Sequence, residues 1–164
     1  MRGTRLLAAT EIIPEMSQTS ALYDNVILDH IKNARNYRAM EHADRMAEGV
    51  NPLCGDSFTV YVRLDGETIR DVSFQCSCCG ISMASASVMT EEVQGKSIEQ
   101  ARQLYRAFTQ MLSNPDAAAA SSELGEAALL SVVRDFPSRR NCAALAWHTL
   151  DAALEGRTSM VLGA

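Results

Sequence analysis

The chain has 164 residues, of which 47% are hydrophobic, and its formal net charge is −5. That length suffices for one globular domain with a substantial core. The acidic balance and the scattered basic residues exclude nucleic acid and anionic membrane surfaces as favoured partners. No apolar run approaches the roughly 18 residues that a membrane span needs.

Both ends are predicted to lie outside a single domain that spans residues 20–156. Residues 1–19 read as a flexible N-terminal tail, because their apolar patch is too short for a secretion signal, and Met16 is a second candidate start. Residues 157–164 read as a C-terminal tail. Five cysteines without such a signal favour a reducing cytoplasm, where thiols are reactive or metal-bound rather than paired.

The first half of the domain predicts a helix followed by a hairpin. Ser20 is a candidate N-cap for a helix with Leu22, Tyr23, Val26, Ile27 and Ile31 on one face. Residues 38–50 are ambiguous between a loop and a short strand at 46–50. The segment 51–56 contains proline and glycine and predicts a turn.

Strict alternation then indicates a half-buried strand at Phe58, Val60, Val62 and Leu64. Asp65 and Gly66 predict a hairpin turn. The return strand carries Ile69, Val72 and Phe74, whose spacing slips by one residue and predicts a bulge.

The second half predicts helices. One follows Cys79, runs to about Gln94 and stops at Gly95, and a capping box at 97–100 opens the next. Residues 117–122 read as a solvated excursion, followed by a short helix at 124–133. Ser138 is the expected cap of a last helix with Cys142 in its first turn. This order predicts the α+β class, with a small, about three-stranded antiparallel sheet packed by helices.

Three cysteines occupy local settings that suit a thiolate ligand. Cys54 lies in the turn, Cys79 precedes a helix, and Cys142 begins one. Zinc takes four tetrahedral ligands and favours thiolate, and Asp56 offers a carboxylate two residues after Cys54. None of the spacings is that of a zinc finger, so the alternative of buried cysteines acting as small hydrophobes stays open.

Other candidate groups favour structural roles. His30, His42 and His148 are more typical of packing or surface positions than of ligands. The eight methionines do not cluster, which indicates core filling. Ser82, Ser85 and Ser87 have no neighbouring His/Asp pair that would make a nucleophile, so close helix packing explains them better.

Four segments in the right order resemble the SufU branch of the IscU/NifU-N family of iron–sulfur cluster biogenesis proteins. The likeness covers about Leu22 to Leu154 and is carried by residues 22–36, 51–56, 79–91 and 136–147. The resemblance implies a small antiparallel sheet packed by helices. It also implies a metal site formed by Cys54, Asp56, Cys79 and Cys142.

By this resemblance the protein binds zinc, docks on a SufS-like, PLP-dependent cysteine desulfurase, and accepts its persulfide sulfur on Cys54 for downstream iron–sulfur assembly proteins. Two alternatives remain. The first is an IscU-like scaffold that assembles a [2Fe–2S] cluster, or binds iron, on the same residues. The second is a zinc-stabilised interaction module without transfer activity.

The chain also departs from the family pattern. Asn141 stands where IscU-type members have histidine and SufU-type members usually have lysine. Residues 113–136, in contrast, agree with the pattern, because they look like the SufU insertion. Cys76 and Cys78 replace the usual glycines, and Gly80 replaces serine. The two extra cysteines read as neutral replacements, with alternative ligation, a persulfide relay or a disulfide left open.

Overall fold

The computed structural model describes residues 24–163, and for residues 115–122 the backbone path only. The predicted tail 1–19, the cap at Ser20 and the apolar positions Leu22 and Tyr23 lie outside this range. The elements in chain order are α3 (Asn25–Lys32), β1 (Arg45–Asn51), β2 (Asp56–Asp65), β3 (Thr68–Ser77), α4 (Gly80–Val93), α5 (Ile98–Ser113), η1 (Pro115–Val133), α6 (Pro137–Leu154) and β4 (Ser159–Val161). The α+β class is confirmed.

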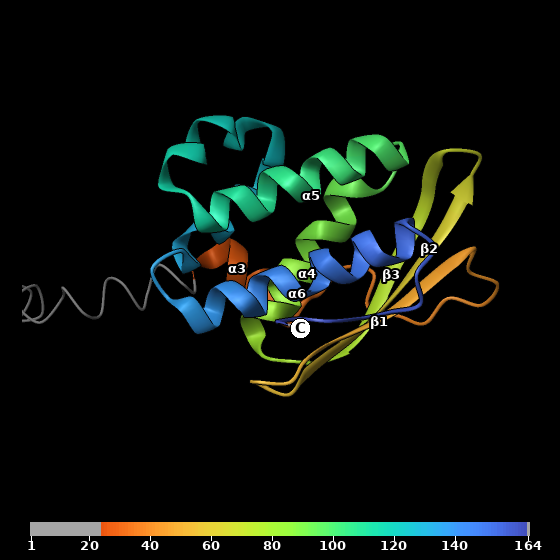
Figure 1. Cartoon of the computed structure of the whole chain (residues 1–164), viewed down its shortest axis with the longest axis horizontal. Coiled ribbons are helices and arrows are strands. Elements are labelled where there is room, and N and C mark those ends of the chain that lie inside the picture. The colour runs from red at the N-terminus through yellow and green to blue at the C-terminus, as the bar shows by residue number, and fades with distance from the viewer. Residues whose placement is uncertain (1–23, 164) are drawn as a thin grey trace, which may run out of the picture.

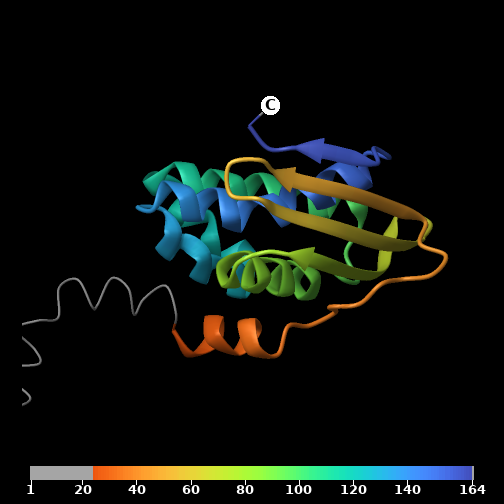
Figure 2. The same ribbon diagram turned by 90° about the horizontal axis from the view of Figure 1, so that it is seen from below.

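The sheet has the strand order β3-β2-β1-β4 (Figure 2). The pairs β1–β2 and β2–β3 are antiparallel, and β4 lies parallel to β1. The expected count of about three strands is therefore low by one. The fourth strand falls within residues 157–164, which were predicted to be a tail, because three residues with two exposed side chains carry no periodic signal.

The predicted hairpin is confirmed in its details. Phe58, Val60 and Val62 point into the core and are at most 2% exposed. Gly66 adopts a positive φ of 62°, which glycine tolerates without steric cost. The register shifts after Arg63 in β2, so that Arg70 is the extra residue of the predicted bulge in β3.

The helices pack over one face of this sheet, and α4 lies at the centre of the helical layer (Figures 1 and 2). Helices α3 and α6 and the segment η1 all contact α4. Its small side chains allow this close packing, and most of the helix is buried. The predicted bounds, including the stop at Gly95 with φ 86°, agree with the structure.

Two helix boundaries differ from expectation. Asp24 caps α3, which begins at Asn25, since the Asp24 carboxylate accepts a hydrogen bond from Ile27 N at 2.9 Å. Helix α6 begins at Pro137 with Phe136 as N-cap, because proline suits the first helical position. Ser138 is therefore inside α6 rather than its cap, and Cys142 lies in the second turn.

The predicted excursion and short helix form one 3₁₀ segment, η1, interrupted at Gly125. Residues 123–133 of this segment pack inward through four buried residues, Leu124, Ala127, Leu130 and Val133. The predicted capping box of α5 is confirmed, with Ser97 and Gln100 bonding each other's backbone N–H at 3.0 Å.

Candidate metal centre

Asn51 shapes the loop that presents Cys54. The Asn51 side chain is 3% exposed and accepts a hydrogen bond from Leu53 N at 3.1 Å, and its backbone oxygen accepts one from Gly55 N at 2.9 Å. Gly55 takes a φ of 77°, which favours glycine. The loop turns tightly between β1 and β2 and leaves Cys54 exposed.

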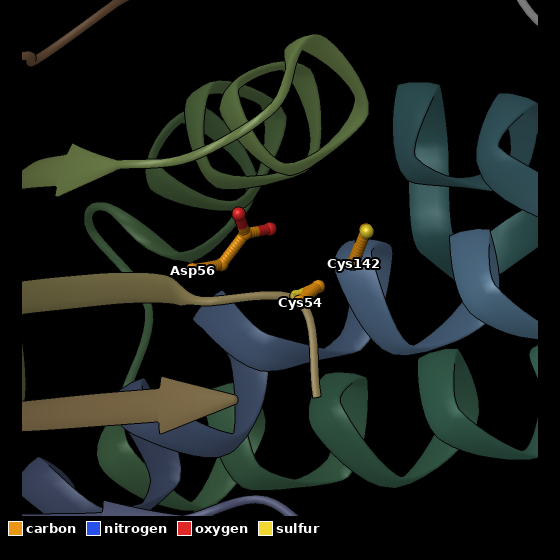
Figure 3. A group of neighbouring side chains, drawn as sticks. All are labelled: Cys54, Asp56 and Cys142. Carbon is orange, nitrogen blue, oxygen red and sulfur yellow. The ribbon is translucent and has the colours of Figure 1, made fainter. Parts of the chain in front are cut away.

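Asp56 and Cys142 lie inside, beside this loop. Asp56 opens β2 and is 8% exposed, and Cys142 on α6 is 4% exposed. Figure 3 shows the side chains of Cys54, Asp56 and Cys142 gathered from the loop, β2 and α6. One ligand atom of each lies within 4.8 Å of the other two.

This donor set suits zinc. Two ligands of one zinc ion lie less than about 4.6 Å apart, twice the Zn–S distance of about 2.3 Å. The observed separations therefore need only a small adjustment for the three groups to share an ion. Two thiolates and a carboxylate are ligands that zinc accepts. The residues present thus fit the metal that the family resemblance implies.

Cys79 reaches the same region but stands outside the mutually close trio. It is the N-cap residue of α4, as predicted, and is half-buried. Its Sγ lies 3.4 Å from Ser82 Oγ. Cys79 needs the larger movement to become the fourth ligand.

The two thiols of Cys79 and Cys142 form a coupled pair. The pKa of Cys79 is lowered to about 5, chiefly because the Cys142 thiol donates a hydrogen bond to the Cys79 sulfur, with a further contribution from Ser82. The same contact raises the pKa of Cys142, and burial adds to that rise. Without metal, this contact favours one thiolate and one thiol over two thiolates.

Ser82 was interpreted only as a packing residue, yet it contacts the site. Its hydroxyl lies 2.8 Å from Asp56 Oδ2 and 3.0 Å from the Cys142 carbonyl oxygen. Both are acceptors, and the single hydroxyl proton serves one at a time. The signal available in the sequence was position: Ser82 follows Cys79 by three residues in a helical first turn, where side chains return toward the cap.

Cys76 and Cys78 are joined by a disulfide, with their Cα atoms 5.6 Å apart. The expectation that the thiols are unpaired, and the interpretation of these two as neutral replacements, are therefore wrong for this pair. The disulfide was one of the alternatives left open. Ligation of metal by Cys76 or Cys78 does not occur in this state, because a disulfide sulfur is not a thiolate.

The histidines lie elsewhere, as expected for structural groups. His30 is 1% exposed, with Nδ1 2.7 Å from Ser87 Oγ and Nε2 3.0 Å from Glu126 Oε1. With Glu91 it forms a second group of possible ligand atoms among the described residues. Arg35 approaches Glu91 to 3.9 Å, so this group reads as an ion-pair link between α3, α4 and η1.

The fold and the cysteine-containing loop define a known class of protein. The family model described as the NifU-like N-terminal domain matches residues 22–154, and the chain belongs to this family. The family-level resemblance seen in the sequence is thereby confirmed.

Particular relatives include two bacterial proteins. The chain is 38% identical over 130 residues to the zinc-dependent sulfurtransferase SufU of Bacillus subtilis, covering 79% of this chain and 87% of the relative. It is 37% identical over 140 residues to the iron–sulfur cluster assembly scaffold protein IscU of Streptococcus pyogenes, covering 85% and 87%.

Solved structures of other proteins have a similar fold. A protein described as an iron–sulfur cluster assembly scaffold for the SUF system, from Fervidobacterium islandicum, matches with a TM-score of 0.73 at 32% identity, over 81% of this chain and 96% of that one. The N-terminal NifU-like protein of Brucella abortus matches with a TM-score of 0.78 over 85% of this chain and 96% of that one, and at 22% identity it supports the fold alone.

Within residues 24–163, no helix is both long and apolar enough to cross a membrane.

Proposed function

We propose that this protein is a zinc-binding sulfur acceptor for iron–sulfur cluster assembly in the cytoplasm. A PLP-dependent, SufS-like cysteine desulfurase would supply the sulfur, and downstream assembly proteins would receive it. The observation that carries the proposal is the placement of exposed Cys54 beside Asp56 and buried Cys142, with ligand atoms within 4.8 Å of one another.

Cys54, Asp56, Cys79 and Cys142 hold the metal in this proposal. Bound zinc keeps thiolates deprotonated and shields them from oxidation until a ligand is exchanged. Exposure separates the roles of the sulfurs. Cys54 is open to a partner, whereas Cys142 is 4% exposed and suited to retain the metal.

Sulfur transfer to Cys54 needs no additional reagent. The Cys54 thiolate attacks the outer sulfur of a persulfide on the desulfurase cysteine, the S–S bond breaks, and the desulfurase thiolate leaves. One S–S bond forms as one is broken. Because no net oxidation occurs, an exposed thiolate on a glycine-containing loop is sufficient.

The surface around Cys54 supports docking of a protein partner. Leu53, directly before the acceptor, is 89% exposed, and Val50 in the neighbouring strand is 37% exposed. Covering such apolar side chains on docking removes them from water, which favours association. A desulfurase that covers Leu53 would bring its own cysteine to Cys54.

Sequence differences favour acceptance of sulfur over cluster building. Asn141 stands before Cys142, where IscU-type members carry a histidine ligand. The segment between α5 and α6 corresponds to the insertion of SufU-type members and forms η1. The B. subtilis relative, named as a zinc-dependent sulfurtransferase, is consistent with this choice.

The test is persulfide uptake by the full-length protein, with the Cys76–Cys78 disulfide intact, from a cysteine desulfurase supplied with L-cysteine. We expect a mass increase of one sulfur atom on Cys54 and its loss in Cys54→Ala. The variant Cys76→Ser/Cys78→Ser removes two other sulfurs and serves as the control that still takes up sulfur. Undiminished uptake in Cys54→Ala would overturn the assignment.

A second candidate function is a scaffold for a [2Fe–2S] cluster, which the similarity to the S. pyogenes relative favours. Metal analysis of protein isolated without oxygen separates the two. Colourless protein with one zinc supports sulfur acceptance, whereas brown protein with iron and sulfide supports a scaffold. Zinc without any persulfide uptake would leave a zinc-stabilised interaction module.

A further inference from the structure

The disulfide between Cys76 and Cys78 lies where β3 leaves the sheet toward the candidate metal centre. Both residues are half-buried, and they are two positions apart in the sequence. A cross-link that closes so short a loop removes little entropy from the unfolded chain, so it contributes little to stability. Reversible redox chemistry explains the pair better than a structural staple does.

Strand pairing places this pair beside the acceptor loop. The last paired residues of the hairpin at this end are Ser57 and Ser77. Asp56 begins β2 directly before Ser57, and Cys78 follows Ser77 just after the end of β3. Paired residues of antiparallel strands lie about 4.5–5.5 Å apart at Cα, so the Ser57–Ser77 pair brings Cys78 to the end of the hairpin where the turn with Cys54 enters β2.

Cys79 fixes the other side of the same junction. Its sulfur lies 3.4 Å from Ser82 Oγ, which itself lies 2.8 Å from Asp56 Oδ2. Cys78 is bonded to Cys79 in the chain, so it is one residue away from the contact network of the site. The acceptor and the pair thus share one end of the hairpin.

We propose that Cys76 and Cys78, in their dithiol form, reduce the persulfide on Cys54 and release its sulfur as hydrosulfide. This activity rests on the proposed function, because Cys54 must first accept sulfur. It would convert an acceptor that only carries sulfane sulfur into one that delivers sulfide, the oxidation state that iron–sulfur clusters contain.

The reaction balances in two thiol–disulfide exchange steps. In the first, the Cys78 thiolate attacks the inner, Cys54 sulfur, and hydrosulfide leaves with the bonding electrons, which gives a Cys54–Cys78 disulfide. In the second, the Cys76 thiolate attacks Cys78, and Cys54 leaves as thiolate. The dithiol loses two electrons, and the sulfane sulfur gains them. The observed Cys76–Cys78 disulfide is the product state.

Return to the dithiol requires an external thiol reductant, either a small thiol or a dithiol protein. A groove of about 480 Å³ on the sheet reaches Cys76 and Ser77, and its wall includes Tyr37 and Gln75. Tyr37 is 44% exposed, and its hydroxyl donates to the Cys76 carbonyl oxygen at 3.0 Å. Cys76 is thus accessible to a reductant from this groove.

The experiment is a single turnover with full-length protein. The protein is reduced and desalted, then mixed with a cysteine desulfurase that carries one persulfide and has been freed of L-cysteine. Sulfide is measured after an acid quench, and alkylation with mass spectrometry reports the state of Cys54, Cys76 and Cys78. We expect one sulfide and one Cys76–Cys78 disulfide for each sulfur transferred.

The matched variants separate the steps. In Cys76→Ser/Cys78→Ser the persulfide should stay on Cys54. This variant should release sulfide at least about tenfold more slowly than the wild type, because no resolving dithiol is present. Cys76→Ser alone should release sulfide and then stop as a Cys54–Cys78 mixed disulfide, which a merely structural pair would not form. Cys78→Ser should behave as the double variant does.

Two results would overturn the inference. Equal sulfide release by the wild type and the double variant, with persulfide on Cys54 in both, refutes the reductase activity and leaves sulfur acceptance intact. Absence of persulfide and sulfide from both proteins refutes sulfur acceptance and the reduction that depends on it. Circular dichroism of each variant excludes misfolding as the cause.

Discussion

At the scale of single residues, Ser82 connects three parts of the candidate metal centre. Its hydroxyl contacts the Asp56 carboxylate, the Cys142 backbone and the Cys79 sulfur. The side chain is fully buried, so water does not replace it as a donor. A hydroxyl that forms a hydrogen bond to a metal-binding group orients that group and affects its affinity for the metal.

We predict that Ser82→Ala weakens zinc binding by about 10–100-fold, because Asp56 loses its hydrogen-bonded neighbour. The free energy of unfolding of the metal-free protein should also fall, by about 1–3 kcal/mol, since a buried acceptor is left without its donor. Chelator competition measures the first effect and urea denaturation the second.

Ser85→Ala provides the matched control one turn further along α4. The Ser85 hydroxyl donates to the Ala143 carbonyl oxygen at 2.6 Å and accepts from Trp147 Nε1 at 3.2 Å. This variant should lose stability but keep its zinc affinity. Equal losses of zinc affinity in both variants would show that Ser82 acts through the helix and not through the ligand.

Among the secondary-structure elements, β1 and α6 pack so closely that only glycine fits at their contact. A Cβ added to Gly49 would overlap Thr149 Oγ1 and lie 3.2 Å from Met160 Sδ. Thr149 is fully buried, and its hydroxyl donates to the Leu145 carbonyl oxygen at 2.8 Å. The close approach of strand and helix therefore depends on the absence of a side chain at position 49.

We predict that Gly49→Ala lowers the free energy of unfolding by about 1–3 kcal/mol through overpacking. Combining it with Thr149→Ala should recover part of that loss, because the overlapping hydroxyl is removed. Urea denaturation of both single variants and the double variant gives the coupling energy. Purely additive effects would contradict the proposed contact.

The same contact explains why β1 was ambiguous in the sequence while β2 was not. In β2 the inward residues are large and apolar, so alternation is plain. In β1 the inward positions hold Ala47, Gly49 and Asn51, whereas Met46 and Val50 face outward. The alternation is inverted because α6 packs too closely for large side chains. No pattern in the strand itself contains that information.

Helices α5 and α6 are linked by Tyr105 and His148. The Tyr105 hydroxyl and His148 Nδ1 lie 2.6 Å apart, and their rings meet edge to face. Burial lowers the pKa of His148 below its ordinary value of 6.5. The folded state therefore holds a neutral ring, whose Nδ1 can accept the tyrosine hydroxyl proton.

This predicts a pH-dependent stability with a defined sign. Below about pH 6.5 His148 binds a proton in the unfolded chain more readily than in the folded protein. Protonation therefore favours the unfolded state, and the free energy of unfolding falls as the pH falls. Above that pH the contribution is complete. The variant His148→Gln should show a shallower slope between about pH 5 and pH 7 in urea denaturation. An unchanged slope would show that His148 does not titrate differently on folding.

At the scale of the whole molecule, the candidate site depends on the arrangement of distant segments. The turn chemistry around Cys54 and the N-cap position of Cys79 were predictable because they are local. The meeting of Cys54 with Cys142 was not, since it follows from how α6 packs beside the loop that joins β1 to β2 (Figure 3). Only the family resemblance indicated it. The Cys76–Cys78 disulfide was an open alternative, because sequence separation cannot tell a pair of thiols from a disulfide.

A metal at this site would join the β1–β2 loop, the start of α4 and α6, so zinc should stabilise the whole fold. With free zinc at 100 times its dissociation constant, we predict a gain of about 2.7 kcal/mol in the free energy of unfolding. For a chain of this size that gain raises Tm by about 5–10 °C. Thermal unfolding with zinc and with a chelator measures the difference.

Two variants test whether this stabilisation comes from the candidate site. Cys142→Ser should lose most of the zinc-dependent rise in Tm, because it removes the buried ligand of the trio. Cys76→Ser/Cys78→Ser should keep it, because a disulfide pair supplies no thiolate to the metal. If Cys142→Ser kept the zinc-dependent rise in Tm and Cys76→Ser/Cys78→Ser lost it, the metal would be bound by the neighbouring cysteine pair and not by the trio. In that case Cys54 would be a free thiol, and zinc could not be what protects the sulfur acceptor.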